Sequence, residues 1–198
     1  SGPWVFSIIG ILLVGIFSAS IVVPSILVTQ FQTSVTYLVA SSLILTGLVQ
    51  LAFTRFVSDR LFEKKREVIL PNLNGLMLIV VMVASVIGTF CLFILLPELG
   101  LLYRLLMLAG FVLMCAVWVM TVFLSGMKRY KAIVILFGCA YALIVLTALW
   151  WRPHGLEGLL AGFVFGHLIL LAGMWVLTVR EFNPQGKLIS FEFADSKK

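Results

Sequence analysis

The chain has 198 residues, of which 62% are hydrophobic and only 11% are charged. A soluble domain carries about a quarter charged residues, so this composition excludes an ordinary water-soluble protein and predicts a chain surrounded by lipid. The net charge of +6 does not indicate nucleic-acid binding, because the basic residues cluster in short loops between long apolar runs.

Five breaks divide the apolar sequence into six predicted transmembrane helices, each close to the roughly 20 residues that cross a bilayer. These spans are residues 4–28, 34–54, 70–96, 103–125, 132–150 and 156–179. We therefore expect an all-α, polytopic bundle of six transmembrane helices in residues 1–182, followed by a cytoplasmic connector in residues 183–198. The apolar run at the start is too long for a signal peptide and lacks a basic segment before it. Since the sequence also has no initiator Met, we expect a piece of a longer protein or one trimmed at its start.

The first two spans are rich in hydroxyl groups. Ser18 and Ser20 lie in the first span, and Ser41, Thr46 and Gln50 lie in the second. As a pair, these helices are expected to line a polar cavity suited to sugar hydroxyls. The alternative is that each hydroxyl bonds to a carbonyl of its own helix.

The stretch at residues 55–67, RFVSDRLFEKKRE, separates the second and third spans and holds 8 of the 22 charged residues. With the other loops on the same side, it places twelve of the fourteen Lys and Arg residues on one face of the membrane. The positive-inside rule then predicts that both ends of the chain are cytoplasmic. Arg55, Asp59 and Glu63 follow one another at four-residue spacing, which would let Asp59 pair with Arg55 and the second span continue as a helix beyond the membrane. The alternative is a solvated loop that faces the lipid headgroups.

Span six carries Gly158, Gly162 and Gly166 at strict four-residue spacing. Such a row lets backbones approach closely, which predicts a tight contact inside the bundle, a dimer face or a surface that slides during transport. His167 follows the row near mid-membrane depth. It is interpreted either as part of a proton path or as a neutral imidazole bonded to a neighbouring helix.

Catalysis and metal binding have little support in the sequence. Cys91, Cys115 and Cys139 match no metal-ligand spacing and are expected to be buried small hydrophobic residues. Ser125 and His167 lack the context of an activated serine. We predict no enzyme activity, no metal and no cofactor. Beyond span six, Ile189, Phe191 and Phe193 alternate with polar residues, so this stretch is expected to lie on the inner leaflet or to dock on another domain.

Several segments together resemble the PelG family of bacterial exopolysaccharide systems. They are SGPW at 1–4, TRFVSDRLFEKK at 54–65, LPNLNG at 70–75 and SGMKRYKAI at 125–133. The resemblance implies a flippase-like inner-membrane transporter with two six-helix lobes facing each other across a cavity. It also implies export of the Pel polysaccharide, rich in N-acetylgalactosamine, from cytoplasm to periplasm during biofilm formation. This chain would be the first lobe.

The same resemblance implies partners in addition to the lipid bilayer and the polysaccharide: a cytoplasmic glycosyltransferase and other Pel inner-membrane proteins, one of which senses cyclic di-GMP. A second hypothesis follows, in which the chain is a membrane scaffold that anchors the glycosyltransferase without conducting polymer. Under either hypothesis Arg55, Asp59 and Arg60 are expected to act as a cytoplasmic gate or docking element. The substrate path is expected at Ser18, Ser20, Ser41, Thr46, Gln50 and His167.

Overall fold

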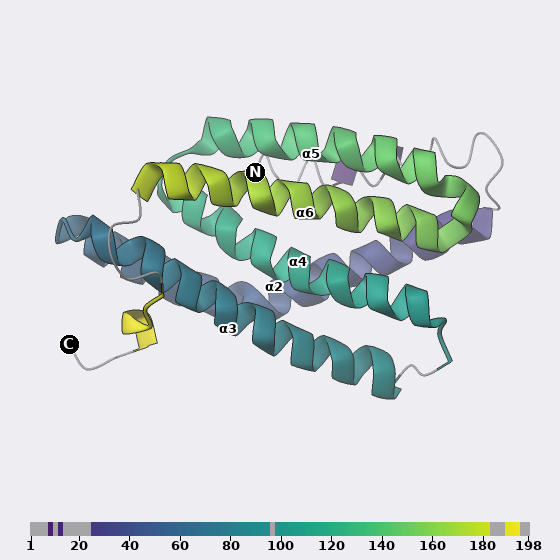
Figure 1. Cartoon of the computed structure of the whole chain (residues 1–198), viewed down its shortest axis with the longest axis horizontal. Coiled ribbons are helices and arrows are strands. Elements are labelled where there is room, and N and C mark those ends of the chain that lie inside the picture. Colours follow the sequence, from purple (N-terminus) through teal and green to yellow (C-terminus); the bar gives the residue numbers. More distant parts are fainter. Residues whose placement is uncertain (1–7, 10–11, 14–24, 96–97, 183–188, 195–198) are drawn as a thin grey trace.

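The computed structural model describes residues 8–9, 12–13, 25–95, 98–182 and 189–194. In this part of the chain there are five long helices and no strand (Figure 1). They are α2 (Ser25–Phe62), α3 (Ile69–Thr89), α4 (Leu101–Gly126), α5 (Tyr130–Trp151) and α6 (Gly155–Phe182). All five are long and apolar enough to cross a membrane. The predicted all-helical membrane architecture is therefore confirmed for the described residues.

The first predicted span lies mostly outside the described residues, so the count of six helices stays a prediction. Of residues 4–28 the structure describes only 8–9, 12–13 and 25–28. The break predicted between residues 28 and 34 was wrong, because α2 begins at Ser25 and runs through it. Four of the five intervening residues, 29–33, are polar but uncharged, and a helix satisfies their backbone hydrogen bonds as well as a loop would.

α2 is longer than a bilayer is thick. Its 38 residues extend for about 57 Å, against about 30 Å of hydrocarbon. The helix continues past Arg55 to Phe62, which confirms the expected helical extension of the second span. It ends where Lys64 adopts a positive φ of 60° and the amide of Lys65 bonds to the carbonyl of Arg60 at 3.0 Å, a Schellman-type cap.

The third span is irregular at both ends. A short 3₁₀ turn, Arg66–Val68, leads into α3, and a π-helical stretch, Phe90–Leu95, follows it. Together these segments keep the backbone helical over the predicted third span up to Leu95. A π-helical stretch accommodates an extra residue without breaking the helix.

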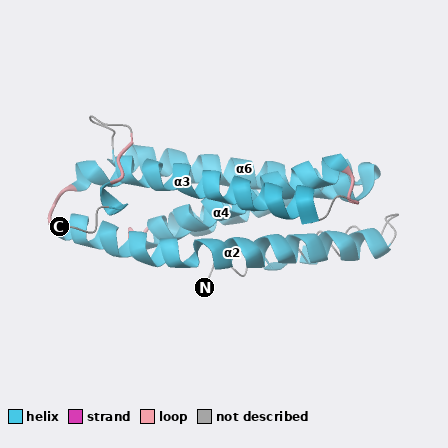
Figure 2. Cartoon of the chain, turned by 90° about the horizontal axis from the view of Figure 1, so that it is seen from below, coloured by secondary structure: helices cyan, strands magenta, loops and turns pink. Residues whose placement is uncertain are grey.

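α4 is the central helix of the bundle. It packs against α2, α3 and α6, whereas α5 packs mainly on α6 (Figure 1). Seen from a perpendicular direction, α2 runs along one long face of the bundle (Figure 2). Accordingly α4 is the most buried of the five helices, with Met114, Met120 and Phe123 among its core residues.

The helices alternate in direction, which brings most basic residues to one end of the bundle. α2, α4 and α6 end there, and α3 and α5 begin there (left in Figure 1). This end, which carries residues 55–67, 128–131 and 180, is named the basic end. The opposite end is named the far end.

The cysteine prediction was right only in part. Cys115 is buried in α4, whereas Cys91 and Cys139 are exposed on the surface of the bundle. In a membrane protein a small apolar side chain facing lipid costs nothing, so low polarity does not predict burial.

The segment Ile189–Ala194 docks on the basic end of the same bundle. The amide of Ser190 donates to the carbonyl of Pro71 at 2.9 Å, and the amide of Phe193 donates to the side-chain oxygen of Asn72 at 3.1 Å. We call residues 189–194 the strap. Docking was one of the two predicted alternatives, but the surface that receives the strap belongs to this chain rather than to another domain.

Candidate functional site

Polar side chains form a stripe along α2. It consists of Ser34, Ser42, Thr46, Gln50, Thr54 and Ser58. Apart from the gap at Leu38, successive members are four residues apart, a spacing that keeps them on one slowly turning face of a helix. The side-chain amide of Gln50 donates to the hydroxyl of Thr46 at 2.6 Å, which links two turns of the stripe. We call this set the α2 stripe.

Hydroxyls of the α2 stripe donate to carbonyls of their own helix. At 2.7 Å, Ser34 donates to Gln30, Thr46 to Ser42 and Thr54 to Gln50. Ser41, beside the stripe, donates to the carbonyl of Tyr37 at 2.6 Å. Each hydroxyl has one hydrogen to donate, so these oxygens offer a substrate acceptor lone pairs only. Each of these hydroxyls therefore follows the second alternative, in which it bonds to a carbonyl of its own helix.

The middle of the stripe holds α2 against α4. Ser42 is 0% exposed and Thr46 is 1% exposed. The indole nitrogen of Trp118 on α4 donates to the hydroxyl of Ser42 at 3.0 Å. In this conformation, Thr46 cannot touch a substrate. Trp118 was not singled out from the sequence, because nothing in a uniformly apolar helix indicates which indole will find a buried acceptor.

The remaining predicted path residues lie in different environments. Ser41 is exposed on α2, and Gln50 is half-buried at the α2 stripe. Ser18 and Ser20 lie outside the described residues. The structure therefore brings Thr46 and Gln50 together by a hydrogen bond and leaves Ser41 on the surface.

A groove opens at the far end beside α2. It comprises two adjoining cavities of about 450 and about 510 Å³, which share Thr33, Ser34 and Tyr103. The hydroxyls of Ser34 on α2 and Tyr103 on α4 lie 2.8 Å apart, so a hydrogen bond joins the two walls. We call these cavities the far-end groove.

The lining of the far-end groove is mostly apolar in the first cavity, with residues such as Leu38, Leu92 and Met107, and it also carries aromatic, hydroxyl and amide groups. Tyr37 and Ser41 line the first cavity, and Gln30 and Glu157 line the second. Ring faces offer apolar contact area, while hydroxyls, amides and carboxylates fix orientation by hydrogen bonding. This mixture suits a molecule with apolar faces and a polar rim. The sequence reading found Ser41 but missed Tyr103, because the match between α2 and α4 depends on how the helices pack.

His167 is enclosed between α5 and α6. It is 0% exposed, its Nδ1 lies 2.8 Å from the carbonyl of Phe163, and its Nε2 lies 3.3 Å from the hydroxyl of Tyr141. The Phe163 ring lies 4.1 Å from the imidazole, centroid to centroid. Since both ring nitrogens have partners within the bundle, the geometry favours a packing role, and His167 is separate from the far-end groove.

The glycine row lies in the contact between α5 and α6. A Cβ atom added at Gly162 would lie 2.5 Å from the backbone nitrogen of Ala148, and one at Gly166 would lie 2.1 Å from a side-chain carbon of Ile144. At Gly158 the added atom would lie 1.9 Å from the carbonyl oxygen of Trp151. These approaches require a residue without a side chain, and they occur inside the bundle.

At the basic end, Arg60 forms an ion pair. Arg60 and Lys65 both pair with one carboxylate oxygen of Glu63, at 2.7 and 3.1 Å. The hydrogen bond from Lys65 and the positive charges of Arg60 and Lys65 lower the pKa of Glu63. Among the described residues Arg55 and Asp59 form no ion pair, and both are exposed.

The described residues contain no group of three or more His, Cys, Asp or Glu side chains that could hold a metal ion. The polar groups in this part of the chain are mostly hydroxyls and amides that bond to helix carbonyls, together with loop charges at the basic end. Such groups bind and orient ligands by hydrogen bonding.

Comparison with known proteins identifies the family. The family model described as "PelG: Putative exopolysaccharide Exporter (EPS-E)" matches residues 1–198. No curated protein and no solved structure matches the chain. The matched region spans the whole sequence, including the α2 stripe, the far-end groove and the basic end. Its apolar helices and lipid-facing surface agree with a multi-pass membrane transporter. The chain therefore belongs to the PelG family of exopolysaccharide exporters.

Proposed function

We propose that this chain is the first lobe of a two-lobe transporter that moves the Pel exopolysaccharide, rich in N-acetylgalactosamine, from cytoplasm to periplasm. In this proposal the basic end faces the cytoplasm of the cell and the helices cross its inner membrane. The observation that carries the proposal is the far-end groove, where Ser34, Tyr37, Ser41 and Tyr103 gather beside one helix. Family membership supplies the polysaccharide as substrate.

The outer half of α2 is the part of the helix suited to a sugar chain. Thr33, Tyr37 and Ser41 are exposed there, whereas the exposed residues between positions 44 and 52 of the same helix are all apolar, among them Ile44 and Leu48. Tyrosine rings can stack on the apolar faces of sugar rings, and hydroxyl oxygens can accept hydrogen bonds from sugar hydroxyls. Polymer would therefore contact the α2 surface in its periplasmic half.

The buried middle of the α2 stripe limits how the path could open. Ser42 and Thr46 become available to polymer only if α2 separates from α4 and the bond from Trp118 to Ser42 is broken. Alternating access between two lobes supplies such a movement in related architectures. The proposed closed state keeps these hydroxyls paired and excludes polymer from the interior of the lobe.

Export measurements on two exposed tyrosines test the proposal. Tyr37 lines the far-end groove, whereas Tyr130 is exposed at the basic end and lies outside it. We expect Tyr37→Ala to lower polymer export roughly two- to tenfold through loss of ring stacking, and Tyr130→Ala to leave it unchanged. Export is measured in sealed vesicles that contain the full exporter and the glycosyltransferase, at matched protein levels. Equal effects of the two substitutions would contradict a path at the far-end groove.

The second candidate function is a scaffold that anchors the cytoplasmic glycosyltransferase. It is favoured by the exposed Arg55 and Asp59 at the basic end, which form no ion pair within the described part of the chain and are available to a partner protein. Combined charge reversal, Arg55→Glu with Asp59→Lys, should abolish co-purification of the glycosyltransferase if the scaffold is correct. For a conduit alone, co-purification should persist, while Tyr37→Ala still lowers export.

A further inference from the structure

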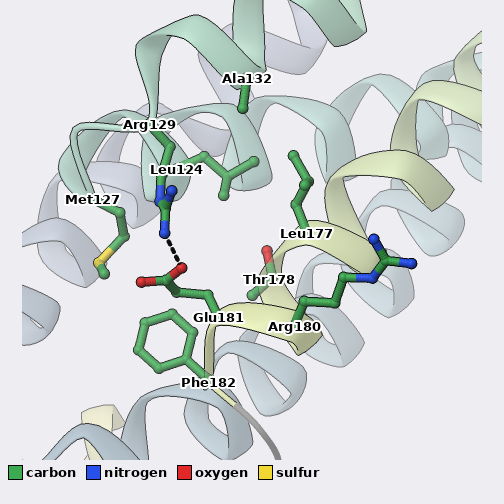
Figure 3. A pocket seen from close by; sticks show the side chains of 9 residues that line it. All are labelled: Leu124, Met127, Arg129, Ala132, Leu177, Thr178, Arg180, Glu181 and Phe182. Carbon is green, nitrogen blue, oxygen red and sulfur yellow. Dashed lines mark hydrogen bonds and ion pairs between the residues drawn. The ribbon is translucent and has the colours of Figure 1, made fainter.

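A second pocket lies at the basic end, where α4, α5 and α6 meet (Figure 3). It has a volume of about 210 Å³, and its walls come from the end of α4, the first turn of α5 and the last turns of α6. Leu124, Ala132 and Leu177 give it apolar walls. The pocket is remote from the far-end groove, since the two sites lie at opposite ends of the helices.

Charged groups stand at the mouth of this pocket. Arg129, the residue before α5, forms an ion pair with Glu181 near the end of α6. Figure 3 shows the side chain of Arg180 extending away from that pair. Within the described residues Arg180 takes part in no ion pair. The pocket therefore carries one more positive charge than negative, and one guanidinium remains available.

Neighbouring residues strengthen the positive charge. Lys128 and Lys131 flank Arg129 along the chain, and both are exposed. With Arg129 and Arg180 they bring four basic residues to the turn before α5, the start of α5 and the end of α6, and Glu181 is the carboxylate that lines the pocket. A guanidinium binds phosphate oxygens through two parallel hydrogen bonds, so Arg180 is a suitable phosphate ligand.

We propose that this pocket binds the phosphate headgroup of an anionic phospholipid, with an acyl chain lying against Leu124, Ala132 and Leu177. A basic pocket between transmembrane helices at the end of the bundle lies where the phosphates of the lipid headgroups are found. A zwitterionic lipid brings its own cation, which reduces its attraction to Arg180. A soluble phosphate would leave the apolar walls unoccupied. The proposal does not depend on the export function.

The general excess of basic residues at this end gives the competing explanation, because a diffuse positive face attracts all anionic lipids equally. A matched control separates the two cases. Arg66 is exposed in the 3₁₀ turn before α3 and does not line the pocket. Arg180→Gln and Arg66→Gln remove the same charge from the same end of the bundle.

Native mass spectrometry of the full protein, titrated with phosphatidylglycerol or with phosphatidylcholine of the same acyl chains, measures the affinities. We expect wild type to prefer phosphatidylglycerol, Arg180→Gln to lower that affinity about fivefold, and Arg66→Gln to change it by less than about twofold. Arg180→Lys keeps the charge and should retain part of the affinity. Glycerol phosphate should not displace the lipid, because it lacks acyl chains.

Three results would overturn the proposal. Equal losses of affinity for phosphatidylglycerol in Arg180→Gln and Arg66→Gln would show that the lipid is attracted by the overall positive charge of this end. Equal affinity of wild type for both lipids would remove the headgroup preference. Displacement by glycerol phosphate would assign the pocket to a soluble anion. If Arg180→Gln does not fold, the affinity for phosphatidylglycerol is compared between Arg180→Lys and Arg66→Lys. Only Arg180→Lys removes a guanidinium from the pocket, so equal affinities of these two variants would overturn the proposal.

Discussion

The side-chain oxygen of Asn72 in α3 accepts a hydrogen bond from the backbone amide of Phe193 at 3.1 Å. Asn72 is 0% exposed, and its amide nitrogen donates to the carbonyl of Val68 at 2.8 Å. One buried side chain thus joins the strap to the first turn of α3. The ring of Phe193 packs edge-on against Phe53, with centroids 5.8 Å apart, which fixes the strap to α2 as well.

Asn72→Ala should release the strap. The substitution leaves the amide of Phe193 and the carbonyl of Val68 without their side-chain partner, and a lost buried partner costs about 1–3 kcal/mol. Hydrogen exchange at the amides of Ser190 and Phe193 measures the release, and we expect protection at both to fall. Ser85→Ala is the control, since Ser85 bonds only to its own helix at Val81. Unchanged protection in Asn72→Ala would show that the aromatic contacts alone hold the strap.

Gly75 provides an independent test of the same docking. A Cβ atom there would lie 2.2 Å from the carbonyl oxygen of Ser190, so Gly75→Ala should push the strap off α3 without touching Asn72. Gly47 in α2 has no atom within 4 Å of the equivalent position. Gly47→Ala should therefore raise stability by up to about 1 kcal/mol through helix propensity and leave exchange at Ser190 unchanged. Equal hydrogen exchange at the amide of Ser190 in Gly75→Ala and Gly47→Ala would contradict the docked position of the strap.

Adjacent serines in α2 should respond very differently to removal of their hydroxyls. Ser42→Ala deprives the buried indole of Trp118 of its acceptor and should lower the free energy of unfolding by about 1–3 kcal/mol. Ser41→Ala removes only an exposed, self-bonded hydroxyl and should change stability by less than about 0.5 kcal/mol. Thermal unfolding in detergent, followed by Trp fluorescence, measures both. A similar loss in the two variants would mean that α2 and α4 are not held together through Ser42.

The positions of four helices could be predicted because apolar length is a direct property of the sequence. α3 begins at Ile69 and α6 at Gly155, each one residue before the predicted start. The start of α2 could not be predicted in the same way, because residues 29–33 near its beginning are mostly polar without being charged. Only charge reliably excludes a residue from a membrane-spanning helix.

Which face of each helix is buried could not be predicted from the sequence, for a physical reason. In water, periodic polarity marks the exposed side of a helix, but here both the lipid-facing and the buried sides are apolar. Leu48 is 83% exposed and Leu73 is 0% exposed, although the two residues are identical in type. The pairs Ser34–Tyr103 and Ser42–Trp118 depend on those faces, so the far-end groove could not be derived. The four-residue spacing of the α2 stripe, by contrast, was available in the sequence.

Gly162→Ala should destabilise the bundle. The added carbon would lie 2.5 Å from the backbone nitrogen of Ala148, and backbone cannot move aside as a flexible side chain can. We expect a loss of about 1–3 kcal/mol, typical of overpacking, against a small gain for Gly47→Ala. Thermal unfolding measures the difference. If the glycine row were instead a dimer face, Gly162→Ala would change the oligomeric state in size-exclusion chromatography and leave the stability of the monomer intact.

The ion pairs of Glu63 should make a small part of the stability dependent on pH. The hydrogen bond from Lys65 and the charges of Arg60 and Lys65 hold the pKa of Glu63 below its ordinary value of 4.5 in the folded state. The stabilisation is therefore fully present above pH 4.5 and is lost as the pH falls through the lowered pKa, where the folded carboxylate takes up its proton. The difference in unfolding temperature between wild type and Glu63→Gln should accordingly shrink on acidification. A pH-independent difference for Glu63→Gln would mean that its carboxylate pairs no more strongly in the folded chain than in the unfolded one.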